Sequence, residues 1–190
     1  MARLARAVGM RARRISALVL DVDGVLTDGR MVLAAGGDEL KSFHSHDGLA
    51  IDFARRAGFR VAFVTGEKAT IAQQRGSKLG VDEILLGVRR KGEAVDALCA
   101  RWQLSADAVA YMGDDLIDIP ALERVGLAMT VADAAPEVRA VAHVVTRARG
   151  GHGAVREAVE MILRAQGRWR ALVEEFVREH GGAGRSRRRR

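Results

Sequence analysis

The sequence is poor in cysteine and proline, and both shortages narrow the class of protein. Its 190 residues include one cysteine, Cys99, and two prolines. A single cysteine cannot form an internal disulfide, and without neighbouring cysteine or histidine ligands it does not make a zinc site. We therefore expect a reducing, cytoplasmic environment. No proline-rich linker or repeat divides the chain, which favours one domain.

Long apolar runs are also missing. The longest are a handful of residues, such as 17–20, whereas a membrane-spanning helix needs about 20. The run that follows Arg14 is interrupted by Asp21 and Asp23, so it does not resemble the apolar region of a signal peptide. The sequence therefore predicts neither a membrane span nor a signal peptide.

Acidic residues are absent from both ends of the chain, although the central part has many. Residues 1–14 contain five arginines, and residues 181–190 contain five more. These arginines more than account for the net charge of +7, so the central part is mildly acidic. We interpret 1–14 and 181–190 as disordered basic tails around one domain, 15–180. Such tails have weak, salt-sensitive affinity for phosphates, and we expect no specific nucleic-acid partner.

The central part alternates short apolar runs with amphipathic stretches, which predicts an α/β fold with a doubly wound parallel sheet. Its apolar runs are nearly continuous, as in strands buried on both faces. The predicted strands are Ser16–Leu20, Arg60–Val64, Glu83–Leu86, Ala108–Met112, Leu127–Val131 and His143–Thr146. The predicted helices are Leu49–Ala57, Ala69–Leu79, Lys91–Gln103, Leu116–Val125 and Ala154–His180.

One segment interrupts this alternation directly after the first strand. Residues 30–33 and 39–43 read as two short strands around the glycine turn 34–38, which predicts a β-hairpin. In open α/β sheets the ligand lies beyond the carboxyl ends of the strands. We therefore expect the hairpin to project over a ligand site.

Paired carboxylates end the first strand. Asp21 and Asp23 are one residue apart, so in a strand they point the same way. A glycine turn and Asp28 follow them. Two acids at the end of a buried strand are costly unless a cation or hydrogen bonds compensate them. A helix cap, the ordinary role of an acid at a strand end, accounts for only one of them.

A second acidic cluster follows the strand Ala108–Met112. It consists of Asp114, Asp115 and Asp118. In a doubly wound sheet the ends of these two strands can be neighbours, which would bring both clusters to one point. Oxygen ligands without cysteine or histidine suit Mg²⁺. Helix capping again explains one of these acids but not three.

A hydroxyl and a cation follow two other strands, at Thr65-Gly66 and at Lys91. Each is ordinary by itself, but the ensemble resembles the four motifs of the haloacid dehalogenase (HAD) superfamily. Several segments are similar to the capless 3-deoxy-D-manno-octulosonate 8-phosphate (KDO 8-phosphate) phosphatase family. They are residues 21–29 (Asp-Val-Asp-Gly-Val-Leu-Thr-Asp-Gly), the hairpin ending in Phe43, Asp47-Gly48, residues 113–118 (Gly-Asp-Asp-Leu-Ile-Asp) and residues 150–157 (Gly-Gly-His-Gly-Ala-Val-Arg-Glu).

This resemblance implies a Mg²⁺-dependent phosphatase of phosphorylated 2-keto-3-deoxy sugar acids that assembles as a homotetramer. It implies that Asp21 attacks phosphorus to form an aspartyl-phosphate, with Asp23 as general acid and base. Asp21, the Asp23 carbonyl and Asp114 would hold Mg²⁺. Thr65 and Lys91 would hold the oxygens of the transferred group. Asp115 and Asp118 would have supporting roles, with Asp118 orienting Lys91 or a metal-bound water.

Substrate length is open to two interpretations. The KDO 8-phosphate enzymes usually carry arginine after the Thr-Gly pair, but here Thr65-Gly66 is followed by Glu67. Together with Arg75 and Lys78, which share a helix face, Glu67 resembles the family's nonulosonate 9-phosphate branch. We expect Gly66 and these three residues to contribute to substrate binding, with Arg75 and Lys78 acting within one subunit or on a neighbouring one. A solvated basic face is the alternative.

Three rival functions remain at this point. The first is a HAD phosphatase that acts on a nonulosonate 9-phosphate of the sialic type. The second is a catalytically silent HAD domain with a regulatory or scaffolding role, against which Asp21, Asp23, Lys91 and Asp114 argue. The third is a nucleic-acid-binding protein, and it rests on the basic tails alone.

Overall fold

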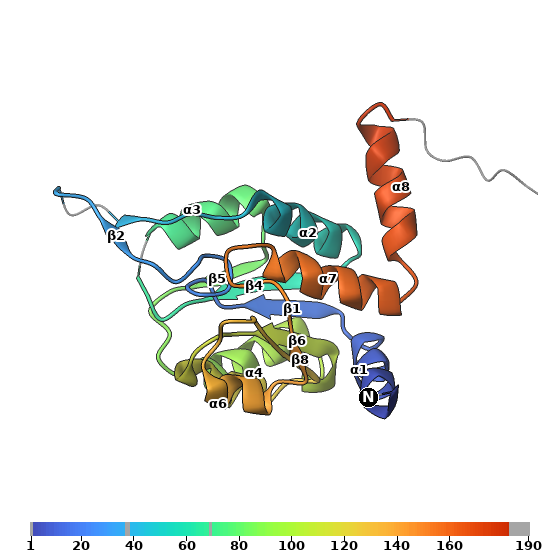
Figure 1. Ribbon diagram of the computed structural model, residues 1–190, viewed down its shortest axis with the longest axis horizontal. Coiled ribbons are helices and arrows are strands. Elements are labelled where there is room, and N and C mark those ends of the chain that lie inside the picture. Colours follow the sequence, from blue (N-terminus) through green and yellow to red (C-terminus); the bar gives the residue numbers. More distant parts are fainter. Residues whose placement is uncertain (1, 37–38, 69, 183–190) are drawn as a thin grey trace, which may run out of the picture.

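Six parallel strands form the centre of the molecule (Figure 1). The structure is a computed structural model, and it describes residues 2–36, 39–68 and 70–182. The strand order is β5-β4-β1-β6-β7-β8, and the predicted doubly wound α/β fold is confirmed. The bounds are β1 Ala17–Leu20, β4 Arg60–Val64, β5 Glu83–Leu85, β6 Val109–Met112, β7 Leu127–Thr130 and β8 Val144–Val145.

Strand β1 is the point at which the order of the strands reverses. It pairs with β4 on one side and with β6 on the other, so that Leu20 aligns with both Phe63 and Met112. All four residues of β1 are buried, which explains the continuous apolar run. Ligands of open α/β sheets bind at such a reversal, beyond the carboxyl ends of the strands.

Helices cover both faces of the sheet (Figure 1). On one face lie α2 (Ser45–Arg56), α3 (Thr70–Leu79) and α7 (Ala154–Ala165). On the other lie α4 (Lys91–Trp102) and α6 (Pro136–Val141), with the short α5 (Ile119–Leu122) in contact with both. Two 3₁₀ helices, η1 (Ala106–Ala108) and η2 (Leu116–Asp118), complete this side. Among the described residues, no helix is long and apolar enough to cross a membrane.

A buried acid joins α2 to α7. Asp47 lies in the first turn of α2 and is 1% exposed. Its Oδ1 accepts a hydrogen bond from the backbone N–H of Arg156, at 2.7 Å, in the first turn of α7. The carboxylate therefore caps a helix in another part of the chain, and its charge is favourable at that positive helix end.

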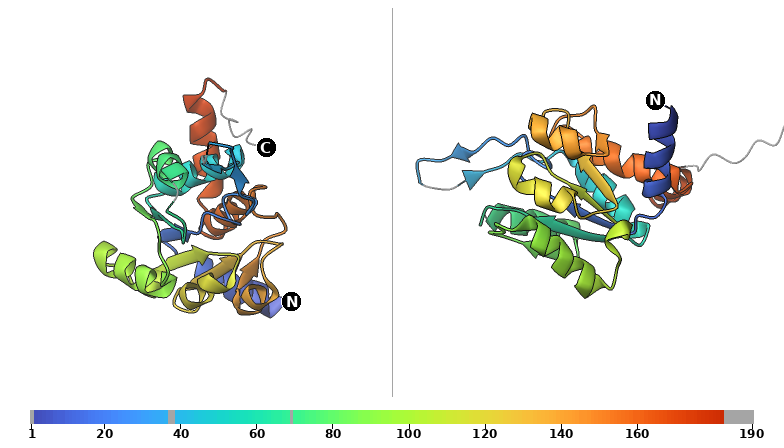
Figure 2. Two further views of the ribbon diagram at one scale, coloured as in Figure 1. Left: turned by 90° about the vertical axis from the view of Figure 1, so that its left-hand side faces the viewer. Right: turned by 90° about the horizontal axis from the view of Figure 1, so that it is seen from below.

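The predicted hairpin is confirmed, and it projects from the layered body (Figures 1 and 2). Its strands β2 (Val32–Leu33) and β3 (Glu39–Leu40) pair antiparallel. Residues 37 and 38 of the predicted turn lie outside the described residues. The described chain runs from the hairpin directly into α2, so no separate cap domain follows β1.

The predicted disorder of residues 1–14 is wrong, because Ala2–Ala12 forms the helix α1. This helix packs on α7 and β7, and Ala12 is completely buried. Gln166 donates from Nε2 to the carbonyls of Ala12 and Ile15, at 3.0 and 2.7 Å. The arginine content concealed the apolar face that holds the segment on the core. Most of the predicted C-terminal tail, 183–190, lies outside the described residues.

The predicted helix Ala154–His180 is in fact two helices, α7 and α8 (Trp169–Glu179). Gly167 separates them with φ +71°, a left-handed conformation that ends helices. The next N–H, of Arg168, bonds to the carbonyl of Leu163 at 2.9 Å, which closes the end of α7. The chain then turns, and α8 stands away from the sheet at the end of the molecule opposite the hairpin (Figure 1).

The predicted helix Leu116–Val125 also forms differently, as η2 followed by the single turn α5. Pro120 lies in the first turn of α5. Backbone N–H groups in a first turn have no acceptor within the helix, so proline, which lacks an N–H, is tolerated there. Asp118 faces inward at the junction and is completely buried. The inward turn of Asp118 and the position of Pro120 divide the segment.

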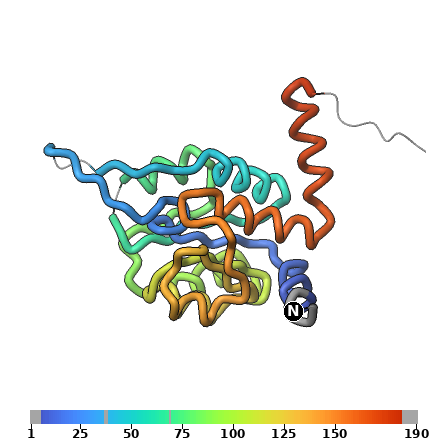
Figure 3. The backbone as a smooth tube through the Cα atoms, in the orientation of Figure 1, coloured from blue at the N-terminus to red at the C-terminus, as the bar shows by residue number. Residues whose placement is uncertain are grey.

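The segment around Gly150 packs directly on the loop that follows β1 (Figure 3). Gly151 donates its N–H to the carbonyl of Val25 at 3.0 Å. A Cβ atom on Gly150 would lie 1.8 Å from the carbonyl oxygen of Gly24, which is too close for any side chain. The loop after β1 and the segment before α7 therefore meet backbone to backbone.

This contact predicts the effect of Gly150→Ala. We expect the variant to lose about 1–3 kcal/mol of stability, since the added methyl group overpacks a backbone contact. That loss corresponds to about 2–4 °C in Tm for each kcal/mol. Thermal unfolding followed by circular dichroism measures it. Gly9→Ala is the matched control, because no atom lies within 4 Å of its added Cβ and alanine favours helix. Equal Tm values for both variants would contradict the packing argument.

Candidate active site

The carboxyl ends of the strands bring most of the predicted site residues together. Asp21 follows β1, Thr65 follows β4, Lys91 opens the helix after β5, and Asp114 follows β6. They surround a cleft of about 290 Å³. Its lining residues are Asp21, Asp23, Gly29, Met31, Thr65, Gly66, Glu67, Arg89, Lys91, Asp114, Asp115 and Ile117.

A buried cation lies at the base of the cleft. The side chain of Lys91 is 2% exposed, and its Nζ lies 2.8 Å from Asp21 Oδ1 and 2.7 Å from Asp118 Oδ1. Burial lowers the pKa of Lys91, but the two carboxylates outweigh that effect and raise the pKa above its ordinary value. Lys91 therefore stays charged beside the predicted nucleophile.

Asp118 holds together the bottom of the cleft by accepting four hydrogen bonds. Its Oδ1 accepts from Lys91 Nζ and from the hydroxyl of Tyr111, at 2.7 and 2.6 Å. Its Oδ2 accepts from the backbone N–H groups of Asp114 and Asp115, at 3.0 and 3.1 Å. Both carboxylate oxygens are thus occupied by protein donors. The residue fixes the lysine and the loop that follows β6.

Asp21 and Asp114 carry the oxygens that remain available for a cation. Oxygens of Asp21, Asp114 and Asp118 lie within 4.8 Å of one another, and Asp118 is already occupied. Asp114 Oδ1 is buried without a hydrogen-bond partner. Burial, together with the charge of Asp118, raises the pKa of Asp114 to about 7 and that of Asp21 well above its ordinary value. Carboxylate oxygens that lack compensation fit Mg²⁺, which prefers oxygen ligands.

Asp23 lies higher in the cleft, with its side chain 25% exposed. Its Oδ2 accepts from the Thr65 hydroxyl at 3.2 Å, and that hydroxyl in turn accepts from the Glu67 N–H at 3.0 Å. Its Oδ1 accepts from Lys41 Nζ. Thr65 and Lys41 therefore orient the carboxyl that was predicted to move protons.

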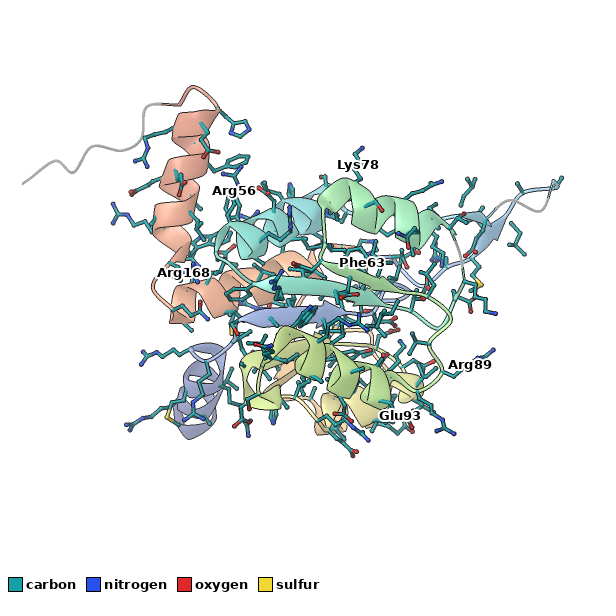
Figure 4. The ribbon with its side chains drawn as sticks, turned by 180° about the vertical axis from the view of Figure 1, so that it is seen from behind. Arg56, Phe63, Lys78, Arg89, Glu93 and Arg168 are labelled. Atoms are coloured by element: carbon teal, nitrogen blue, oxygen red, sulfur yellow. The ribbon has the colours of Figure 1, made fainter. Side chains whose placement is uncertain are left out.

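Two predicted substrate ligands lie away from this cleft. Arg75 is half-buried and stacks over the ring of Phe43, with 5.4 Å between Cζ and the ring centroid. Burial lowers the pKa of Arg75, while Asp47 opposes that change. Lys78 is exposed and points outward from α3 (Figure 4). Neither residue lines the cleft of its own chain, whereas Glu67 does.

Sequence reasoning did not identify three residues of the site: Lys41, Tyr111 and Arg89. Lys41 follows β3, and its position in the returning strand of a hairpin expected over the site was the available signal. Tyr111 lies within the apolar strand β6; its hydroxyl is directed at Asp118, and burial raises its pKa well above the ordinary value. Arg89 lies in a loop, and no pattern in the sequence distinguishes it from Arg90.

Comparison with known proteins agrees with this geometry. Residues 83–157 match the profile of the haloacid dehalogenase-like hydrolases. The chain is 43% identical, over 158 residues, to the 3-deoxy-D-manno-octulosonate 8-phosphate phosphatase KdsC of Escherichia coli strain K12. The aligned region covers 83% of this chain and 84% of the relative. The corresponding protein of Salmonella typhi is 42% identical with the same coverage.

Solved structures show the same likeness. The 3-deoxy-D-manno-octulosonate 8-phosphate phosphatase of Moraxella catarrhalis, in complex with magnesium ion, phosphate ion and KDO, is 33% identical with a TM-score of 0.87. The match covers 89% of this chain and 97% of that one. The phosphatase of Yersinia pestis is 42% identical with a TM-score of 0.84, covering 86% and 88% of the two chains.

The chain is therefore a haloacid dehalogenase-like hydrolase, a class of α/β enzyme whose site lies at the carboxyl ends of the strands. Within this class it belongs to the family of the 3-deoxy-D-manno-octulosonate 8-phosphate phosphatases, which are phosphoric monoester hydrolases. The resemblance predicted from the sequence is confirmed.

The raised pKa of Asp114 predicts a linkage between protons and Mg²⁺. The folded state binds this proton more tightly than the unfolded state does, so metal-free stability falls as pH rises from about 4 to about 7. A cation that replaces the proton binds more tightly as the pH rises through that range. We expect Mg²⁺ to raise the Tm more at about pH 8 than at about pH 5.5, as measured by differential scanning fluorimetry with and without chelator. Asp114→Asn removes one of the two ligands whose pKa is raised, so it should weaken the Mg²⁺ effect and reduce the difference between the two pH values; an equal Mg²⁺ effect on the unmodified chain at both pH values would contradict the linkage.

Proposed function

We propose that this chain is a Mg²⁺-dependent phosphatase that removes the phosphate from KDO 8-phosphate through an aspartyl-phosphate intermediate. One observation carries the proposal: at the base of the cleft, the Asp21 carboxylate contacts Lys91 and lies beside the Asp114 oxygen that has no hydrogen-bond partner. The relatives named for this reaction and the complex with magnesium ion, phosphate ion and KDO support it.

The first half of the reaction uses Asp21 and Asp23. Asp21 attacks phosphorus, the bond from phosphorus to the sugar oxygen breaks, and Asp23 protonates that oxygen as it leaves. Asp23 occupies the more exposed position in the cleft, where the leaving alcohol departs. Lys91 balances the charge of the nucleophile. Asp21, Asp114 and the Asp23 carbonyl would hold Mg²⁺, which would supply the positive charge that lets the anionic nucleophile and the anionic phosphate approach each other.

The second half returns Asp21 to its starting state. A water molecule attacks phosphorus, its proton passes to Asp23, and the bond between Asp21 and phosphorus breaks. Inorganic phosphate leaves, and Asp23 is again protonated for the next substrate. Thr65 keeps Asp23 aimed at the reacting oxygen through its hydroxyl, and Lys91 also balances the charge of the transferred group.

The covalent step predicts the result of replacing Asp21. Asp21→Asn should retain no more than a few per cent of phosphatase activity, because the amide is not a nucleophile and unassisted phosphate ester hydrolysis is extremely slow. Phosphate release from KDO 8-phosphate measures the loss, and circular dichroism verifies that the fold is intact. Asp52→Asn is the control, since Asp52 makes a surface ion pair with Arg56 on α2. An Asp21→Asn protein with substantial activity would exclude the covalent mechanism.

The nine-carbon alternative has one observation in its favour. Glu67 lines the cleft, in the position where the resemblance associates an acid with nonulosonate 9-phosphates. Comparing kcat/KM for KDO 8-phosphate and for nonulosonate 9-phosphates distinguishes the two substrate lengths. Arg75 and Lys78 can contribute to this choice only from a neighbouring subunit, because they lie outside the cleft of their own chain.

We also propose a homotetramer in which the hairpins of the subunits pack together. A two-stranded ribbon is marginal by itself in water. The hairpin exposes apolar side chains, with Val32 at 53%, Leu33 at 73% and Leu40 at 56%. Met31, at its base, is 55% exposed and also lines the cleft. A subunit packed on these residues would shield them and would close the mouth of the site.

The apolar hairpin predicts how assembly can be disrupted. Leu33→Asp places a charge on the surface proposed to be buried between subunits, so we expect the tetramer to dissociate. Light scattering coupled to size-exclusion chromatography measures the molar mass, and the dissociated form should lose activity on KDO 8-phosphate. Val177→Asp is the control, because Val177 is 39% exposed on α8 at the opposite end. A fully active monomer of the unmodified chain would contradict the proposal.

The cytoplasm is the proposed location of this activity. The support is the single cysteine, Cys99, which is typical of proteins that work in a reducing compartment. Fractionation of the source cells, followed by an assay of phosphatase activity in each fraction, tests the assignment.

A further inference from the structure

The charges that line the cleft are unevenly paired. Lys91 is buried between two carboxylates, and Lys41 contacts Asp23 and Glu39. Arg89 also lines the cleft, but it is exposed and makes no hydrogen bond or ion pair with any described residue. In the described part of the cleft it is therefore the cation that remains available to a ligand.

Backbone hydrogen bonds fix the position of Arg89. The Gly87 N–H donates to the carbonyl of Glu67 at 3.0 Å, and the Val88 N–H donates to the carbonyl of Thr65 at 2.9 Å. These two bonds attach the loop before α4 to the loop that carries Thr65. Arg89 comes next in the chain, so its main chain is held beside the catalytic loop while its side chain extends at the end from which the hairpin projects (Figure 4).

We infer that Arg89 binds the carboxylate of the substrate, at the end opposite the phosphate. The inference rests on the proposed function, in which the phosphate lies at Asp21 and Lys91. A phosphorylated sugar acid has two anionic groups, and the second one emerges toward the mouth of the cleft. The planar guanidinium of arginine suits two parallel hydrogen bonds to a carboxylate.

Glu67 contributes to the orientation of the substrate in the cleft. It lines the same cleft and belongs to the loop that the Arg89 loop is bonded to. Like charges repel, so the carboxylate of the substrate is directed away from Glu67 and toward Arg89. Glu67 remains an acceptor for the hydroxyl groups of the sugar. Together the two residues select a substrate that is acidic at one side and hydroxylated at the other.

The neighbouring cations provide controls. Arg90 is also exposed, but it pairs with Glu93 at 3.0 Å and does not line the cleft. Lys78 lies on the outer side of α3 (Figure 4). Arg90→Ala removes the same charge from the same loop and breaks only a surface ion pair, which contributes little to stability.

The experiment compares the unmodified chain with Arg89→Ala, Arg89→Lys and Arg90→Ala. The substrates are KDO 8-phosphate, glucose 6-phosphate, which lacks a carboxylate, and p-nitrophenyl phosphate. We expect Arg89→Ala to lower kcat/KM for KDO 8-phosphate about ten- to hundredfold through KM. The other two substrates should change by less than about twofold. Arg89→Lys should recover part of the loss, and the inhibition constant of KDO as product should rise in parallel in Arg89→Ala.

Two results for the variants would overturn the inference. One is an Arg89→Ala protein that keeps the unmodified preference for KDO 8-phosphate. The other is an equal loss on all three substrates, which would place Arg89 at the phosphate or in the fold. The proposed function is tested separately by the unmodified chain. If that chain prefers a different carboxylated phosphate, the same comparison is made on it; if it prefers no carboxylated substrate, both the substrate assignment and the role of Arg89 are wrong.

Discussion

The active site depends on one buried cation between two buried carboxylates. Removing charges from water is costly, and an ion pair recovers that cost only when every partner is in place. Lys91 belongs to α4, Asp21 to the end of β1 and Asp118 to η2, so three separate segments must meet at one point. A displacement of any of them leaves an uncompensated charge in the interior. The fold is thereby forced to hold Asp21, the proposed nucleophile, in a fixed position.

The sequence was sufficient to locate the acids of this site, because each follows a buried apolar strand. Asp21 and Asp114 are predictable as neighbours once the sheet is taken to be doubly wound. Lys41 was indicated only by its place in the predicted hairpin, and the position of Arg89 in the cleft depends on backbone hydrogen bonds between loops that no local pattern encodes. Composition was misleading for the segment before residue 15, where five arginines conceal apolar residues such as Ala12 that are buried in the folded chain.

Glycine was another limit of sequence reasoning. Gly167 lies inside an amphipathic pattern that continues from α7 into α8, and the apolar spacing alone favours one long helix. The structure shows that the backbone conformation of this residue outweighs the pattern. Phe53 of α2 then packs on both Trp169 and Phe176 of α8, with 5.3 Å between ring centroids in each case. The turn is therefore stabilised by packing that only the folded chain shows.

The contact between Gly150 and the loop after β1 has a consequence for biosynthesis. Domains begin to fold while the ribosome is still adding residues. Asp21, the proposed nucleophile, is synthesised well before residue 150, and the loop that follows it is completed by a segment made about 130 residues later. At about 5–20 residues per second, the interval between the two lasts from about 6 to about 26 seconds. During that time the loop that follows Asp21 lacks the backbone contact that Gly150 and Gly151 supply in the folded chain.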